Sequence, residues 1–261
     1  MTAHFDPNMY LRHITLVGCG GTGSLLARFI ARMLWDMKQR RMHLPDVTFI
    51  DFDKIEEQNC SRQLFVSQEI GQFKSQILMR RYNLAFGLEI SAITAPVDAE
   101  KHFPSSGIVI DAVDNHEARR ELAKLSDRHV ILACGNDRVT GQVSIGNVSD
   151  RERALQAVDN LGERVYSLPT AYALFPELIE PEVEIEPTAM PISCAALTEI
   201  GSQHLLINDT IATTAALYLY RILHRQPIES FLTFIGIDPI LTIRSLLIQR
   251  AELLAYLKPA G

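Results

Sequence analysis

The sequence predicts a protein of the α/β class, with a doubly wound, mostly parallel sheet and an antiparallel extension toward the C-terminus. The first observation is that short apolar runs alternate with helical segments through the first 150 residues. This alternation is typical of a parallel sheet with helices on its faces. The second is that residues 142–148 instead alternate apolar and polar side chains, as a half-exposed strand does.

The elements of the first half follow from their apolar spacing. In residues 24–37, the side chains of Leu26, Ile30, Met33 and Met37 recur at the spacing of one helix face. Short apolar runs that end in glycine or aspartate predict buried strands between such helices. The expected strands are residues 14–17, 47–50, 90–93, 108–110 and 130–134, and the expected helices are residues 24–37, 68–86 and 116–125.

The pattern is less regular in the second half. Residues 162–191 contain five of the chain's 12 prolines and a cluster of glutamates, which predicts a long irregular loop. Its role is either solvated surface or a substrate-facing lid, and both remain open. A helix then runs to about His224, with Asn208 or Asp209 as its N-cap. Residues 231–237 and 240–248 are expected to form a terminal strand and connecting segments.

The length of the chain suits one domain with an appended piece. Its 261 residues are 47% hydrophobic, which allows a large core. We expect residues 1–150 to form a nucleotide-binding core and residues 151–192 to form a long loop or insertion. Residues 193–261 would add a helix and strands that complete the same domain.

Composition argues against several classes of partner and site. The net charge is -6 and no basic block stands out, so no nucleic-acid partner is expected. The longest apolar stretches contain Arg28, Arg32 or Arg221, so no membrane span is expected. The four cysteines are scattered singly without a CxxC pair, so no structural zinc is expected. The N-terminus lacks a signal-peptide pattern, and a cytoplasmic protein with reduced thiols is the expectation.

A glycine-rich turn is the strongest local signal. Gly18, Gly20, Gly21 and Gly23 directly follow the first strand and open a helix. Glycine lets the backbone turn tightly and approach a phosphate, and the helix N-terminus behind it presents free N–H groups. Asp51 ends the second strand, where a carboxylate can accept ribose hydroxyls. This pattern predicts a Rossmann-like nucleotide site, without separating NAD from ATP.

The polar residues that follow favour ATP. Two cations, Arg62 and Lys74, come after Asp51 together with the amide Gln63, and such groups suit a triphosphate. Asp114 falls after the fourth strand, at the edge where ligands bind in such sheets. It is a candidate ligand for magnesium. Taken singly, these cations could be surface charges, and Asp114 could be a helix N-cap.

This set resembles a known family. Residues 18–23, Asp51 with Asp53, Asn59 with Arg62 and Gln63, Lys74, and Asp114 with Asn115 resemble the adenylation core of the ThiF, MoeB and ubiquitin-activating enzyme superfamily. The resemblance covers roughly residues 10–150 and, more loosely, the C-terminal helix. Residues 14–23, 62–65 and 191–197 are similar to the ThiF-family protein of the PRTRC gene cluster.

The resemblance implies roles for these residues. Asp51 would bind the ATP ribose, with Asp53 beside it and the glycine turn under the adenosine. Asn59, Arg62 and Lys74 would contact the phosphates with support from Gln63, and Asp114 would coordinate Mg²⁺. Arg62, Lys74 and Asp114 would then act in catalysis. The implied reaction is adenylation of the C-terminal glycine of a small ubiquitin-like β-grasp protein, with release of pyrophosphate. A homodimer is also implied.

The sequence departs from that family at several places. Relatives often carry an arginine in an N-terminal helix that reaches the partner subunit's site, but Arg12 is the sole arginine before the first strand. The source of such an arginine therefore stays open. Cys194 follows the long loop and precedes a helix, where a thiol can have a lowered pKa. It is a candidate thioester carrier, although we favour a small buried side chain.

Two alternatives remain at this point. An NAD-dependent oxidoreductase would explain the glycine turn and Asp51 but would leave Asn59, Arg62, Lys74 and Asp114 without a role. A catalytically inactive binding module of the same fold would not need this polar set.

Overall fold

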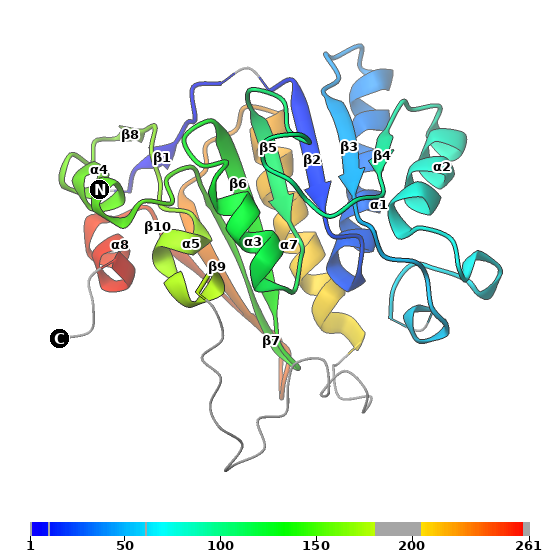
Figure 1. The fold of residues 1–261 in the computed structure, drawn as a ribbon. Helices are drawn as coiled ribbons and strands as arrows, with labels where there is room; N and C mark the ends of the chain where they lie inside the picture. Colours follow the sequence, from blue (N-terminus) through cyan, green and yellow to red (C-terminus); the bar gives the residue numbers. More distant parts are fainter. Residues whose placement is uncertain (1, 10, 61, 181–204, 258–261) are drawn as a thin grey trace.

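A computed structural model of the chain describes residues 2–9, 11–60, 62–180 and 205–257. Its centre is an eight-stranded sheet in the order β10-β9-β7-β6-β5-β2-β3-β4 (Figure 1). The five parallel strands are β2 (His13–Val17), β3 (Asp46–Ile50), β4 (Ser91–Ile93), β5 (Gly107–Asp111) and β6 (His129–Asn136). The antiparallel strands are β7 (Thr140–Gly146), β9 (Ser230–Gly236) and β10 (Thr242–Leu247). The predicted fold class is confirmed.

Helices and short elements complete the described part of the chain. The helices are α1 (Gly21–Gln39), α2 (Lys74–Phe86), α3 (His116–Ala123), α4 (Arg151–Asp159), α5 (Ala171–Leu174), α7 (Leu205–Leu223) and α8 (Arg250–Leu257). Three 3₁₀ turns are η1 (Glu57–Asn59), η2 (Ser67–Glu69) and η3 (Pro176–Leu178). Two short strands, β1 (His4–Phe5) and β8 (Arg164–Val165), pair in parallel away from the main sheet. Among these helices, none combines the length and hydropathy that crossing a bilayer requires.

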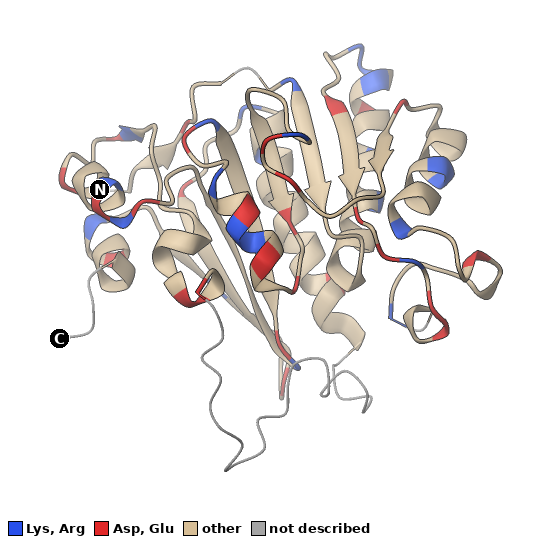
Figure 2. Cartoon of the chain, viewed as in Figure 1, with Lys and Arg blue, Asp and Glu red and all other residues tan. Residues whose placement is uncertain are grey.

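Helices cover both faces of the sheet because side chains alternate along each strand. Leu16 and Ile110 face the larger core, which α1, α2 and α7 help to form. Val109 and Ile131 face the smaller core, to which α3 and α5 contribute. In Figure 2 the strands are almost entirely without charged residues, while helices and loops carry both signs interspersed. This distribution is what strands buried on both faces require.

The helix expected at residues 68–86 begins only at Lys74. Gly71 adopts a left-handed conformation with φ +85°, and its N–H donates to the carbonyl of Ile55 at 2.8 Å. The backbone is thereby held in a bridge to the preceding loop instead of a helix. Ile70, which lies in the stretch expected to be helical, is 44% exposed. The apolar spacing therefore extended the predicted helix by about one and a half turns.

The segment of residues 151–192, expected to form a long loop or insertion, contains helices in its described part. Helix α4 occupies its start because the Asp150 carboxylate caps it, accepting from the Arg153 N–H at 2.8 Å. Ala154 and Val158 of α4 are buried in the larger core. Helix α5 and η3 follow, while residues 181–204 lie outside the described residues. The division into three parts stays a prediction.

Helix α7 packs against α1. Ala212, Ala215 and Ala216 of α7 are buried in the core of this chain, where their small side chains let α7 approach its neighbours closely. Leu205 is the first described residue of α7, and Asn208 lies inside the helix instead of capping it. An amide buried at this position needs hydrogen-bond partners from other elements.

Candidate functional site

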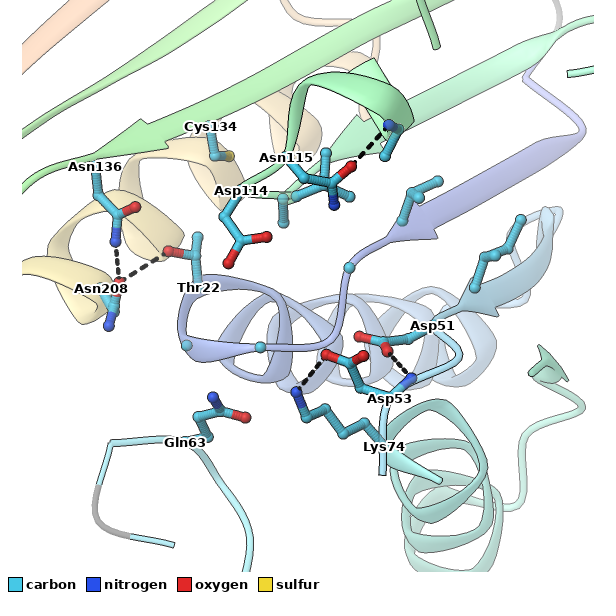
Figure 3. A pocket seen from close by; sticks show the side chains of 18 of the residues that line it. Thr22, Asp51, Asp53, Gln63, Lys74, Asp114, Asn115, Cys134, Asn136 and Asn208 are labelled. Atoms are coloured by element: carbon cyan, nitrogen blue, oxygen red, sulfur yellow. Dashed lines mark hydrogen bonds and ion pairs between the residues drawn. The ribbon is translucent and has the colours of Figure 1, made fainter. Parts of the chain in front are cut away.

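A cavity of about 480 Å³ opens at the carboxyl ends of β2, β3, β5 and β6 (Figure 3). From β2 the chain runs to β3 on one side, whereas β5 and β6 lie on the other side of β2. Such a reversal of strand order separates the loops that follow the strands and leaves a crevice where ligands bind. The topology thus creates the cavity, and the loops after the four strands line it.

The glycine turn forms the floor of this cavity. Gly18 has φ +85° and its backbone passes so close to the β5–α3 loop that a Cβ would lie 2.5 Å from the carbonyl oxygen of Ala112. A Cβ on Gly23 would lie 1.9 Å from the carbonyl oxygen of Gly18. Gly18, Gly20 and Gly21 line the cavity, but Gly23 is not among its lining residues. Helix α1 begins at Gly21 without a side-chain cap, so its first N–H groups suit an anion.

Asp51 closes one side of the floor. Its carboxylate accepts from the N–H of Cys19 at 2.6 Å and from the N–H of Asp53 at 2.7 Å. The side chain is buried, which raises the pKa of Asp51, while the two N–H donors and the Lys74 charge act in the opposite direction. Each oxygen therefore has one backbone donor and keeps a lone pair for a further hydroxyl donor.

Lys74 and Asp53 form an ion pair on the same side. The Lys74 Nζ lies 2.9 Å from Asp53 Oδ2, and the side chain of Lys74 is 8% exposed against 53% for Asp53. Figure 3 shows the pair beside Asp51. A buried ammonium held by one largely exposed carboxylate can also attract a phosphate at the cavity wall.

Arg62 and Gln63 reach the cavity, whereas Asn59 does not. Both Arg62 and Gln63 line it, and the buried Oε1 of Gln63 has no hydrogen-bond partner in the described part of the chain. Such an oxygen is suited to a donor from a ligand. The Asn59 side chain instead accepts from the N–H of Glu56 at 2.9 Å. The backbone carbonyl oxygen of Asn59 accepts from the N–H of Gln63 at 2.9 Å. Asn59 therefore shapes the turn that carries Arg62 and Gln63.

Asp114 lies across the glycine turn from Lys74, on the β5–α3 loop (Figure 3). It does not cap α3, because Asn115 does so by accepting from the Ala118 N–H at 2.8 Å. The Asp114 carboxylate is exposed and lines the cavity. It is thus placed to face a ligand.

The cavity suits magnesium that arrives with a nucleotide. Among the described residues there is no group of three or more His, Cys, Asp or Glu that could hold a metal ion. Mg²⁺ usually binds through one or two carboxylates together with substrate phosphates and water. The carboxylate of Asp114 fits this donor set. Phosphates would have to supply the remaining non-water ligands.

A buried polar cluster on the opposite wall was missed by the sequence analysis. Asn208 of α7 accepts through Oδ1 from the Thr22 hydroxyl at 3.1 Å and from the Asn136 amide at 2.5 Å (Figure 3). Asn136 at the end of β6 and the two residues that follow it, Asp137 and Arg138, also line the cavity. Their place at the end of the next parallel strand was the available signal, because ligand-binding loops gather at that edge.

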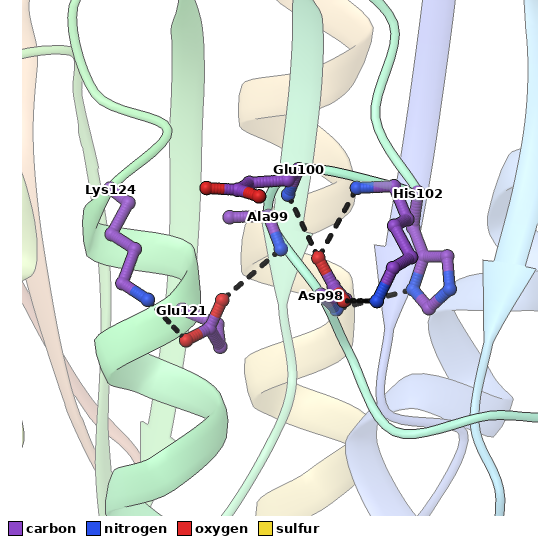
Figure 4. Close-up of polar contacts among 7 residues, drawn as sticks. Asp98, Ala99, Glu100, His102, Glu121 and Lys124 are labelled. Atoms are coloured by element: carbon purple, nitrogen blue, oxygen red, sulfur yellow. Dashed lines mark hydrogen bonds and ion pairs between the residues drawn. The ribbon is translucent and has the colours of Figure 1, made fainter.

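The β4–β5 connection supplies apolar wall. Ala95 and Val97 line the cavity, and Val97 packs on the smaller core. The connection is fixed to α3 because the Ala99 N–H donates to Glu121 at 3.2 Å (Figure 4). Asp98 closes the adjacent turn by accepting from the Glu100 N–H at 3.0 Å and from Lys101 Nζ at 2.6 Å. An apolar wall held in this way suits a flat aromatic base.

The described cysteines are packing residues. Cys19, Cys60 and Cys134 are free thiols, and burial raises the pKa of both Cys19 and Cys134. A raised pKa keeps a thiol protonated and inert. Cys194, the candidate carrier, lies outside the described residues.

Comparison of the sequence with protein families identifies one family. The sequence pattern of the ThiF family matches residues 10–235. Comparison with curated proteins gave no match. Among solved structures, E. coli MccB with MccA-N7isoASN superposes with a TM-score of 0.60 at 15% identity, over 94% of this chain and 66% of that chain.

Two further MccB structures give the same result. E. coli MccB with ATP has a TM-score of 0.60 at 14% identity, over 92% of this chain and 64% of that chain. The Microcin C7 biosynthetic enzyme MccB in complex with N-formylated MccA has a TM-score of 0.60 at 14% identity, over 94% and 66%. The chain thus spans slightly less than two thirds of the MccB chains. At such identities the likeness is one of fold.

Proposed function

The chain belongs to the ThiF family, and on this premise we propose that it is an ATP-dependent adenylyltransferase that activates a C-terminal carboxylate. The observation that carries the proposal is the placement of opposite charges around the cavity. In the proposed complex Asp51 would bind the ribose, Lys74 and the start of α1 would bind the phosphates, and Asp114, which lines the same cavity, would face them. An NAD-dependent reaction would have no use for Lys74 and Asp114.

The proposed reaction requires positioning more than proton transfer. A carboxylate oxygen of the substrate attacks the α-phosphorus of ATP, the bond between the α-phosphorus and the bridging oxygen breaks, and pyrophosphate leaves. Lys74, Arg62 and the first N–H groups of α1 offset the charge that develops on the phosphate oxygens. Bound Mg²⁺ would neutralise phosphate charge, and Asp114 is the carboxylate that would hold it. No enzyme nucleophile is needed.

The proposed reaction has a second substrate, which supplies the carboxylate. We infer a small ubiquitin-like β-grasp protein that ends in glycine, as the resemblance to ubiquitin-activating enzymes and to PRTRC-type ThiF proteins implies. MccB has been crystallised with ATP and with MccA, which supports the general pairing of a nucleotide with a second substrate on this fold. A cytoplasmic homodimer completes the proposal.

The first test is nucleotide binding and exchange. ATP with Mg²⁺ should raise the unfolding midpoint of the protein and NAD should not. With a glycine-terminated β-grasp protein present, the chain should catalyse exchange of labelled pyrophosphate into ATP. Asp114→Ala should lower the exchange rate by at least about a hundredfold while circular dichroism stays unchanged.

Asp46→Ala is the matched control for that variant. Asp46 begins β3 at the opposite edge of the sheet, and its side chain is 86% exposed. Its removal should leave exchange unchanged. Normal exchange by Asp114→Ala would refute the assignment of this carboxylate, and stabilisation by NAD instead of ATP would refute the adenylation itself.

A further inference from the structure

Tyr172 of α5 lies beneath the loop that carries Asp114, on the smaller-core face of the sheet. It is fully buried and is not among the residues that line the cavity. We propose that Tyr172 is a positioning residue that holds the Asp114 loop in place through Asp111, so that α5 and η3 belong to the magnesium-binding half of the site. This inference rests on the proposed function.

The contact between Tyr172 and Asp111 is direct. The Tyr172 hydroxyl donates to Asp111 Oδ2 at 2.9 Å, and the other oxygen of Asp111 accepts from the Val113 N–H at 3.1 Å. Asp111 is 1% exposed. One buried carboxylate therefore connects a side chain of α5 to the backbone one residue before Asp114.

Arg119 also contacts Val113, through the carbonyl oxygen of that residue. Its Nη2 donates to the Val113 carbonyl oxygen at 2.9 Å, and its Nε lies 3.9 Å from Asp111 Oδ2. Both backbone polar groups of Val113 are thus fixed by the Asp111–Arg119 pair. Since Asp114 follows directly, the direction of its side chain depends on this pair.

The segment formed by α5 and η3, which carries Tyr172, also accepts hydrogen bonds from the start of α3. His116 Nδ1 lies 3.0 Å from the Leu178 carbonyl oxygen, and Arg120 Nε donates to the Ile179 carbonyl oxygen at 2.8 Å. The Asp114 loop is therefore bounded by two attachments to one short segment. A shift of α5 and η3 would move the loop and the helix that follows it together.

The arrangement differs from ordinary core packing. A carboxylate buried to this degree is costly to keep, and burial raises the pKa of Asp111. An apolar contact would join α5 to β5 at lower cost. What the carboxylate adds is direction, because hydrogen bonds fix an orientation where apolar contacts do not. Residues behind a metal-facing ligand set its affinity for metal in this way.

The experiment measures ATP binding by calorimetry, once with Mg²⁺ and once with EDTA. Tyr172→Phe removes only the hydroxyl. We expect it to leave ATP affinity in EDTA unchanged and to reduce the gain in affinity that Mg²⁺ brings by about tenfold. Tyr218→Phe is the matched control, since its buried hydroxyl bonds Ser230 and Thr233 away from the cavity. Tyr218→Phe should leave both affinities unchanged. In urea denaturation, both variants should show a lower free energy of unfolding, because each loses a buried hydroxyl.

The outcomes separate the inference from the function it rests on. If the wild type binds MgATP more tightly than ATP and Tyr172→Phe does so equally, the inference is overturned and the proposed function stands. A loss of equal size with and without Mg²⁺ overturns it as well, because it indicates a general structural role. If the wild type binds no ATP, both fall. Should Tyr172→Phe not fold, Asp111→Asn, which is isosteric, must show the same selective loss.

Discussion

Gly20 and Gly23 belong to one turn but meet different surroundings. A Cβ on Gly23 would lie 1.9 Å from the carbonyl oxygen of Gly18, which is backbone and cannot rotate away. Of the residues that the structure describes, a Cβ on Gly20 would meet the side-chain amide of Gln63 alone within 4 Å, at 3.9 Å. The absence of a side chain is thus a packing requirement at Gly23 and a matter of ligand access at Gly20.

This difference predicts opposite results for two alanine substitutions. Gly23→Ala should lower the free energy of unfolding by about 3 kcal/mol or more, because strand and helix must separate. Gly20→Ala should keep most of the stability and weaken ATP binding instead, since its Cβ would project at the cavity floor. Urea denaturation and calorimetry on both variants measure the two effects. Equal loss of stability would show that the turn is limited by packing throughout.

At the scale of elements, α7 ties the second half of the chain to the glycine turn. Asn208 is buried and accepts from Thr22 of α1 and from Asn136 of β6. Replacing its oxygen leaves both donors without this acceptor. The helix is therefore joined to the cavity by polar contacts as well as by its apolar face.

Asn208→Ala should accordingly lower the free energy of unfolding by about 2 kcal/mol. Asp209→Ala, the adjacent change on the same helix, should stay within about 0.5 kcal/mol, because Asp209 is only partly buried. Chemical denaturation of the two variants measures both free energies of unfolding. Similar small losses would mean that the Asn208 contacts contribute little.

At the scale of the whole molecule, several large apolar side chains of the described residues are exposed to solvent. Leu217 of α7 is 61% exposed and Ile243 of the edge strand β10 is 53% exposed. Where such side chains gather into one contiguous patch, the patch marks contact with another chain. Among the described residues, no further strand lies beside the edge strand β10 in the main sheet, and such edges favour association.

We therefore expect a homodimer. Light scattering at micromolar concentration should give twice the mass of the chain, and the mass should fall toward that of one chain on dilution if the association is reversible. A monomer across the micromolar range would contradict this prediction. Adenylation would be unaffected by that result if each cavity is complete in one chain.

Local patterns determined much of the fold. Apolar runs gave the strands, and the alternation of strands with helices gave the parallel sheet, because a helix or a strand is specified by neighbours two to four residues away. The same reasoning placed the glycine turn, Asp51 and Asp114 at one edge, since parallel strands all end there. Short-range competition explains the errors. The bridge at Gly71 shortened α2, and the Asp150 cap started α4 where a loop was expected.

Contacts between distant parts of the chain were decided only by the tertiary structure. Asn208 meets Thr22 across 186 residues and Tyr172 meets Asp111 across 61. Asn59 turns into its own loop instead of toward the cavity. The sequence by itself determined which residue types reach the ligand-binding edge. Which of them face the cavity and which hold it from behind depended on packing between layers, because a buried polar group takes its direction from whichever partner the fold brings within hydrogen-bond distance.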